Sequence, residues 1–155
     1  SLWAEVVQKS LAAGETVGGL FRLLLTCLRA LESTGVERVA YATTQFLWRF
    51  LDLAGYRPDP CACERCGRSF AESEGASWLG ASGTLACAAC AGASGFAISA
   101  GARRYLEATR DLDLAAALGV SVDAASLAGM ERALAFAIRG VLETDLASLR
   151  AGRRR

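Results

Sequence analysis

Cys63-Glu64-Arg65-Cys66-Gly67 and, twenty residues later, Cys87-Ala88-Ala89-Cys90 are the most informative stretches of this sequence. In each stretch two residues separate the cysteines, a spacing that lets the chain turn as a knuckle and point both sulfurs at one metal ion. Gly67 follows the first pair and suits the backbone turn that a knuckle needs. Because two knuckles complete a tetrahedron, the sequence predicts one structural zinc ion held by Cys63, Cys66, Cys87 and Cys90.

The segment from Trp78 to Leu85, between the knuckles, is predicted to form two short strands around a turn. These strands are too small to bury a core of their own, so a metal ion would hold them together. The alternatives are a pair of disulfides or six free thiols, which this spacing disfavours. Cys61 is an alternative ligand to Cys63, although Cys61-x4-Cys66 makes a poorer knuckle. Cys27 lies on an apolar helical stripe and is predicted to belong to the core.

Apolar residues at helical spacing flank the cysteines on both sides. Helices are predicted over residues 2–13, over the stripe from Leu20 to Leu31 after a break at Gly18 and Gly19, over 36–54, over a segment capped by Ser99, over 113–118, and along the stripe from Leu127 to Leu149. The predicted fold class is mainly α: a helical bundle with an inserted four-cysteine, zinc-ribbon-like finger. Its parts are the first half of the bundle (1–60), the finger (61–95) and the second half of the bundle (96–155), and the helices are expected to have an apolar core separate from the finger.

Composition and charge exclude several classes of protein. Hydrophobic residues make up 53% of the chain, yet no apolar run reaches the roughly 18 residues of a membrane-spanning helix. The formal charge is +1, and four thiolates with one zinc ion would lower it to about −1. No signal peptide is recognisable, and six cysteines in metal-type spacing favour a reducing cytoplasm. The chain starts at Ser1 and its only methionine is Met130, so we expect a further segment N-terminal to it.

Histidine is absent from the sequence. This removes the commonest general base, the Ser-His and Cys-His pairs, and catalytic zinc sites of the histidine type. A closed four-thiolate site also leaves no coordination position for an activated water molecule. The sequence therefore predicts a protein that is not an enzyme.

Two arginine clusters are candidate DNA contacts. All but one of the 17 basic residues are arginine, and arginine binds phosphate well. The first cluster is expected on the outward face of the helix after Ser99, whose inward positions are Ala102, Leu106 and Thr109. The tentative DNA-binding residues are Arg103, Arg104 and Arg110 in the first cluster and Arg150, Arg153, Arg154 and Arg155 in the second. The alternative is that both clusters are simply solvated faces.

The run Leu53-Ala54-Gly55-Tyr56-Arg57-Pro58, followed by Cys63-x2-Cys66-Gly67 and a second Cys-x2-Cys, resembles the RecO DNA-repair proteins, the bacterial recombination mediators. The opening Trp3-Ala4-Glu5-Val6-Val7, the run from Leu20 to Leu25 and a long last helix follow in the family's order. The resemblance covers nearly the whole chain. It also matches the family's four zinc positions to Cys63, Cys66, Cys87 and Cys90, with Cys61 at a position that is not a ligand.

The resemblance implies a helical bundle with a zinc finger, which follows an N-terminal oligonucleotide-binding barrel in the complete family member. That barrel is not among these 155 residues. The family takes part in DNA repair and homologous recombination: it anneals complementary strands and helps to load recombinase. The implied partners are single- and double-stranded DNA, a RecR-like protein and the acidic tail of single-stranded-DNA-binding protein, in a bacterial cytoplasm beside the nucleoid, with no membrane. The alternative function is a zinc-ribbon protein-interaction module that binds no nucleic acid.

Overall fold

The computed structural model describes residues 2–13, 17–80 and 83–152, with side chains at 3–10, 18–80 and 83–143. Two helices open the chain, α1 (Leu2–Ala13) and α2 (Val17–Thr34). The predicted helix over 2–13 is confirmed. The predicted break at Gly18 and Gly19 is wrong, because both glycines lie inside the first turns of α2, where burial of neighbours such as Leu20 outweighs the low helix propensity of glycine.

The remaining long helices follow the predicted apolar stripes. A 3₁₀ turn, η1 (Val36–Arg38), leads into α3 (Val39–Leu53), and α7 (Ala124–Gly152) ends the described chain. The helix α5 (Ala100–Thr109) begins where Ser99 Oγ accepts a hydrogen bond from the backbone of Ala102 at 3.0 Å, as predicted. The short helix α6 (Leu114–Gly119) is capped in the same way by Asp113.

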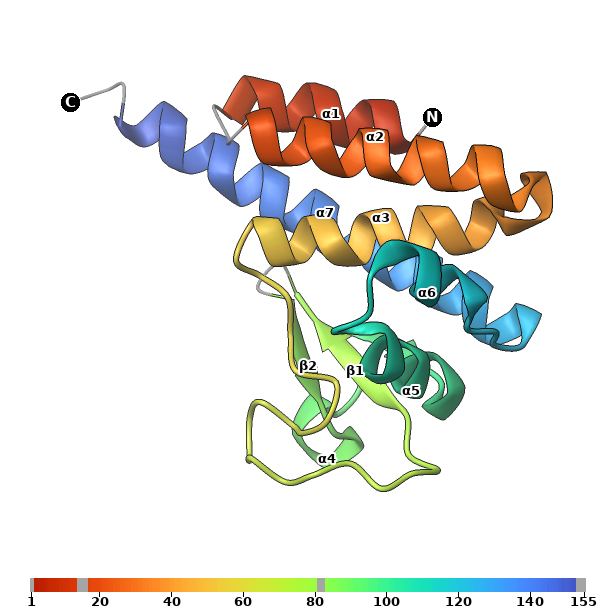
Figure 1. Ribbon diagram of the computed structural model, residues 1–155. Coiled ribbons are helices and arrows are strands. Elements are labelled where there is room, and N and C mark those ends of the chain that lie inside the picture. Colours follow the sequence, from red (N-terminus) through yellow and green to blue (C-terminus); the bar gives the residue numbers. More distant parts are fainter. Residues whose placement is uncertain (1, 14–16, 81–82, 153–155) are drawn as a thin grey trace.

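A small antiparallel sheet lies between α3 and α5 in the sequence (Figure 1). The predicted strands are β1 (Ala76–Leu79) and β2 (Thr84–Ala86), and β2 leads to the four-residue helix α4 (Ala88–Ala91). A third strand, β3 (Phe96–Ile98), was not predicted; it pairs with β1 on the side away from β2. Gly95 makes this pairing possible, because its φ is +90° and a Cβ there would lie 2.6 Å from the carbonyl oxygen of Trp78.

The apolar core lies between α3 and α7, with α2 packed along α3 and α1 packed chiefly along α7 (Figure 1). Trp3 of α1 stacks on Phe46 of α3, with 4.8 Å between ring centroids. The side chains without measurable exposure in this core include Phe46, Leu47, Trp48, Leu51, Met130, Leu134 and Ile138. A helical bundle is therefore the main body of the protein, as predicted.

The sheet packs against the bundle through Trp78 of β1. This ring meets the edge of Trp48 on α3, with 6.4 Å between centroids and 86° between the ring planes. Leu85 and Ile98 from the other two strands are buried in the same cluster as the helices. The expectation of a separate bundle core is thus wrong, because one face of the sheet belongs to that core; the boundaries 61–95 of the finger stay a prediction.

Within the described residues, no helix is both long enough and apolar enough to cross a membrane.

Candidate metal centre

The four cysteines of the two knuckles converge at the end of the sheet remote from the bundle. The sulfurs of Cys63, Cys66, Cys87 and Cys90 all lie within 4.8 Å of one another. Zn–S bonds of about 2.3 Å in a tetrahedron place the sulfurs about 3.8 Å apart, so the donor set fits a four-thiolate metal site after a small contraction. The structure brings together the four predicted ligands and leaves Cys61 outside the cluster.

The first knuckle is built by backbone hydrogen bonds inside the loop from α3 to β1. The N–H of Cys63 donates to the carbonyl of Arg68 at 2.8 Å, and the N–H of Gly67 donates to the carbonyl of Cys63 at 2.8 Å. Gly67 has a φ of +76°, a conformation that other residues rarely adopt. The predicted role of this glycine in the turn is therefore confirmed.

The second knuckle follows β2 directly. The N–H of Cys90 donates to the carbonyl of Cys87 at 3.1 Å as the chain enters α4. The backbone N–H of Cys87 also points across the site and donates to the sulfur of Cys63 at 3.3 Å. This bond ties the two knuckles together and favours a thiolate at Cys63.

Hydrogen bonding divides the protons unequally among the sulfurs. The backbone N–H of Cys87 lowers the pKa of Cys63 to about 6, and the backbone N–H of Cys90 lowers the pKa of Cys87. The Cys90 thiol shares its proton with the sulfur of Cys87, which raises the pKa of Cys90 to about 12. A metal ion that binds all four sulfurs takes the place of these shared protons, because thiolates are the ligands.

An ion pair closes the loop behind the first knuckle. The guanidinium of Arg68 donates to both carboxylate oxygens of Glu74, at 2.9 and 2.5 Å. Arg68 thereby lowers the pKa of Glu74 to about 2. A two-pronged pair of this kind fixes direction as well as distance, so it restrains the return of the loop toward β1.

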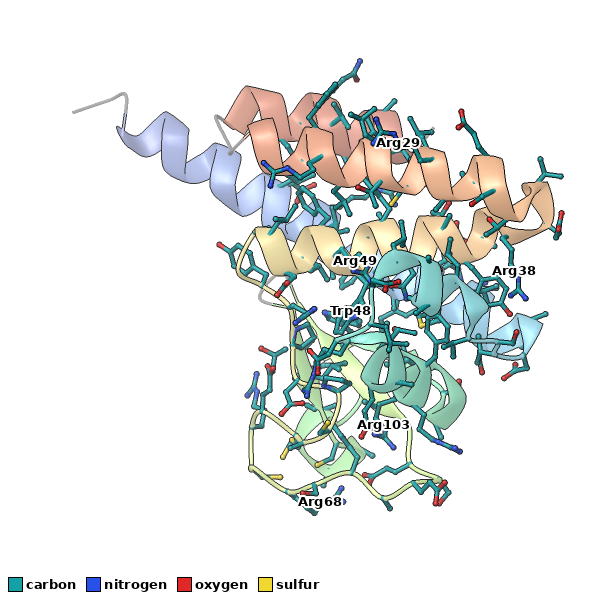
Figure 2. The ribbon with its side chains drawn as sticks, in the orientation of Figure 1. Arg29, Arg38, Trp48, Arg49, Arg68 and Arg103 are labelled. Carbon is teal, nitrogen blue, oxygen red and sulfur yellow. The ribbon has the colours of Figure 1, made fainter. Side chains whose placement is uncertain are left out.

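Arg103 does not face outward as predicted. Only 2% of it is exposed, because its guanidinium points into the loop before β1 and donates to backbone carbonyls there (Figure 2). Its nitrogens are occupied, so it is not available to a phosphate group. The outward position was inferred from the inward stripe of the helix and from the charge of arginine, and the loop supplies the partners that make burial favourable.

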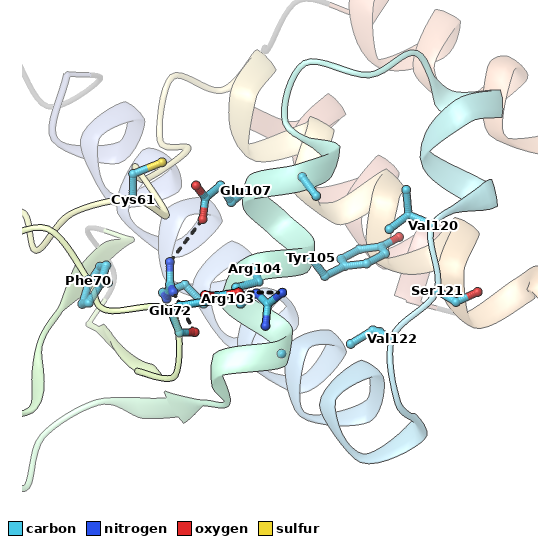
Figure 3. A pocket seen from close by; sticks show the side chains of 12 residues that line it. Cys61, Phe70, Glu72, Arg103, Arg104, Tyr105, Glu107, Val120, Ser121 and Val122 are labelled. Carbon is cyan, nitrogen blue, oxygen red and sulfur yellow. Dashed lines mark hydrogen bonds and ion pairs between the residues drawn. The ribbon is translucent and has the colours of Figure 1, made fainter.

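Arg104 of α5 and Arg110, the residue that follows α5, reach the surface but are paired with acids. Arg104 lies 3.3 Å from the Glu72 carboxylate, and Arg110 lies 3.4 Å from those of both Asp59 and Asp111. Figure 3 shows Arg104 and Glu72 on the wall of a hollow of about 710 Å³ beside α5. The side chain of Arg150, and all of Arg153, Arg154 and Arg155, lie outside the described residues, so the DNA-binding role of these arginines stays a prediction.

A surface that the sequence analysis missed lies where α7 crosses β3. Phe136 is 46% exposed, and its ring lies 6.1 Å from that of Phe96. Arg132 and Arg139 flank Phe136 along α7 and line the same hollow of about 460 Å³. We call this set the Phe136 groove. The sequence contains a pattern that could have indicated this surface. Phe136 lies outside the apolar stripe of the last helix and is one helical turn from both Arg132 and Arg139.

The arrangement defines a class: a helical bundle that carries a small sheet with four clustered cysteines, which could hold one metal ion. Comparison with protein families is more specific, because residues 1–150 match the family described as "Recombination protein O C terminal". The chain belongs to this family, and the resemblance to RecO proteins is confirmed. The family implies a role in DNA repair and recombination, with DNA and recombination proteins as partners in general. Comparisons with curated proteins and with solved structures gave no match.

Proposed function

We propose that this chain is the partner-binding part of a recombination mediator, which supports strand annealing and recombinase loading by holding DNA and proteins. The observation that carries the proposal is the family match over residues 1–150. The cluster of four cysteines supports it, because the resemblance implies a finger at these positions. The proposed compartment is a bacterial cytoplasm beside the nucleoid, where thiols stay reduced.

The proposed protein catalyses no covalent step. The sequence contains no histidine, and a closed site of four thiolates offers no position for substrate or activated water. Its activity would then be measured as binding or annealing without turnover.

The proposed ion is zinc, one per chain, in a structural role. Four sulfurs within 4.8 Å of one another suit zinc, which favours four thiolate ligands in a tetrahedron. Metal analysis of single serine variants tests the ligand set: Cys63→Ser is expected to lose zinc and Cys61→Ser to keep it. The opposite result would assign the ligand role to Cys61.

DNA binding by this chain is expected to be weak and sequence-independent. The exposed arginines of α5 already have acidic partners, so a phosphate would have to displace a carboxylate. With three or four contacts from Arg104, Arg110 and the terminal cluster, log affinity should fall against log salt with a slope of about −2 to −4. Single strands and duplex should compete similarly, since phosphate contacts carry no base information.

Fluorescence anisotropy at several salt concentrations tests this expectation. Glutamine variants of Arg104 and Arg110, and separately of the terminal cluster, assign the contacts. Nanomolar affinity with a steep slope would mean that a larger surface is in use. Absence of binding even at low salt would favour the alternative function, a zinc-ribbon interaction module that binds no nucleic acid; the carboxylate partners of the α5 arginines are the observation that favours this alternative.

The Phe136 groove is the proposed site for an acidic protein tail with apolar residues, such as that of single-stranded-DNA-binding protein. Two aromatic rings offer an anchor, and Arg132 makes no ion pair within the described part of the chain. Arginine pairs well with peptide carboxylates. A second partner, a RecR-like protein, is proposed from the family alone.

An acidic peptide with apolar residues at its carboxyl end and a fluorophore at its amino end tests the groove. Phe136→Ala and Arg132→Gln are each expected to weaken binding, whereas Leu53→Ala, a change at another exposed apolar residue, serves as the matched control. Failure of the wild-type chain to bind the peptide at high micromolar concentration would refute this site.

A further inference from the structure

Two of the four proposed metal ligands lie in a loop with little regular secondary structure. Residues 54–75 connect α3 to β1, and a single bridge between Ala62 and Ser69 is the strand pairing described within them. Cys63 and Cys66 lie in the middle of this loop. Such a loop becomes ordered either before the metal binds or as it binds. This ordering costs conformational entropy, which weakens metal binding.

Arg103 of α5 binds this loop from the side of the bundle. Its Nε donates to the carbonyl of Glu74 at 2.8 Å, its Nη1 to that of Pro60 at 3.0 Å and its Nη2 to that of Ala71 at 2.9 Å. The Glu107 carboxylate, one turn along α5, lies 3.3 Å from Nη1. The guanidinium is thus held on both sides, by its own helix and by the loop, and Figure 3 shows it between them.

The bonded carbonyls lie on both sides of the first knuckle in the sequence. Pro60 precedes Cys63, whereas Ala71 and Glu74 follow Cys66. The ring of Phe70, in the returning arm of the loop, lies 5.3 Å from the guanidinium carbon. One side chain of the bundle therefore joins the two arms of the loop that presents two of the four sulfurs.

We propose that Arg103 is a positioning residue for the metal: it closes the first knuckle loop before the ion arrives and thereby raises the affinity of the site. The planar guanidinium suits this task, since its five donors point in fixed directions toward several acceptors. Lysine has one ammonium group and cannot reach three separate carbonyls in the same way. The inference rests on the proposal that the four cysteines bind zinc.

The neighbouring Arg104 provides a matched control. It lies on the same helix, but its side chain is 55% exposed, and it pairs with Glu72, whose side chain is 82% exposed. Loss of Arg104 removes one positive charge and one exposed ion pair to the returning arm, but it leaves the buried hydrogen bonds that join the two arms in place. A purely electrostatic effect of arginine on the thiolates would appear in both variants, whereas the positioning effect belongs to Arg103 alone.

Zinc affinity is measured by competition with a chromogenic chelator for the wild-type chain and for Arg103→Gln, Arg103→Lys and Arg104→Gln. Supporting groups around metal ligands typically change affinity by about 10- to 100-fold. We expect a loss of that size in both Arg103 variants and a change below about twofold in Arg104→Gln. Circular dichroism shows whether each variant retains its helices. If Arg103→Gln does not fold, the zinc affinity of Arg103→Lys tests the proposal.

Trypsin gives a readout that needs no metal. Arg65 and Arg68 are cleavage sites inside the loop, so cleavage after them reports how often the loop opens in the chelator-treated protein. We expect faster cleavage in both Arg103 variants than in the wild type or Arg104→Gln. Equal affinities and equal cleavage rates in all four proteins would overturn the proposal. A wild-type chain that binds no zinc would refute the metal assignment, and the trypsin comparison would still test the loop closure.

Discussion

The bundle and the finger are stabilised by different means. In the bundle, α3 and α7 face each other with fully buried side chains such as Phe46, Leu47, Leu134 and Ile138. The finger has a small cluster around Leu79 that includes two of the four clustered cysteines, and half of the residues in the loop 54–75 are exposed. Burial of apolar area therefore stabilises the bundle, whereas the finger has a few polar contacts and, in the proposed function, a metal ion.

The bundle and the finger contact each other through two buried side chains. Trp78 joins them through an apolar contact with Trp48, and Arg103 joins them through hydrogen bonds to the knuckle loop. Both contacts are buried. Each can be broken separately, so the two kinds of stabilisation can be measured one at a time.

Removal of the metal is expected to have the largest effect. Structural zinc contributes about 10–16 kcal/mol of apparent binding free energy in small fingers. The change Cys87→Ser, or chelation, should abolish binding of one zinc per chain and open the loop to trypsin after Arg65 and Arg68. Most helical circular dichroism should remain, because the long helices lie outside the finger.

Atomic absorption on the purified chain gives the metal content, and a parallel dichroism measurement gives the helical signal. The change Cys27→Ser, in the bundle core, is the control for removal of a thiol outside the metal site. Loss of the whole helical signal in one step would show that finger and bundle unfold together.

The apolar contact between the regions should have the next largest effect. Trp78→Ala removes a ring without measurable exposure, and such deletions typically cost about 3–5 kcal/mol of unfolding free energy. Urea unfolding of the zinc-loaded protein measures the change, with Leu53→Ala, at an exposed position, expected to stay within about 0.5 kcal/mol. A cost below about 1 kcal/mol for Trp78→Ala would mean that the bundle does not need the sheet.

Features of the sequence that act locally predicted most of the fold. The cysteine spacing predicted which four cysteines cluster, because two residues between sulfurs constrain a knuckle whatever surrounds it. Apolar stripes gave the helices, and Ser99 marked the start of α5. Gly18 and Gly19 misled the prediction, because the packing of α2 outweighs the local preference of glycine.

Features that depend on distant parts of the chain could not be predicted. The strand β3 has three residues, and its pairing with β1 depends on the turn at Gly95. Arg103 is charged, so a side chain that faces solvent was expected. Its burial depends on backbone carbonyls of the loop before β1, which lies some 30 to 40 residues earlier in the chain. No periodicity within α5 carries that information.

Acid should weaken the knuckle loop through Glu74. Arg68 lowers the pKa of this carboxyl from 4.5 to about 2, so the pair stabilises the folded loop above pH 4.5 and loses its contribution as the pH falls from 4.5 toward 2. The chelator-treated wild type should therefore lose thermal stability across that interval, and Glu74→Gln should lose less. Thermal unfolding at pH 6, 4.5 and 3 measures the difference; parallel pH profiles would mean that the ion pair does not restrain the loop.

Loss of the exposed ion pair between Arg110 and Asp59 should have the smallest effect on stability. This pair also joins the end of α5 to the loop 54–75. Its atoms are 3.4 Å apart, and the side chains are 36% and 51% exposed, so water and salt screen the attraction. Exposed pairs of this kind contribute about 0.2–1 kcal/mol, and Arg110 also has Asp111 as a second partner.

A double-mutant cycle of Arg110→Gln and Asp59→Asn isolates the pair. Asparagine at position 59 keeps a side-chain oxygen for the backbone N–H of Cys61, which donates to Asp59 at 2.9 Å, so that contact cancels in the cycle. We expect a coupling energy of at most about 0.5 kcal/mol, lower still in 0.5 M salt. A coupling above about 1.5 kcal/mol that survives salt would mean that charge at the surface, and not the buried guanidinium of Arg103, fixes the finger to the bundle.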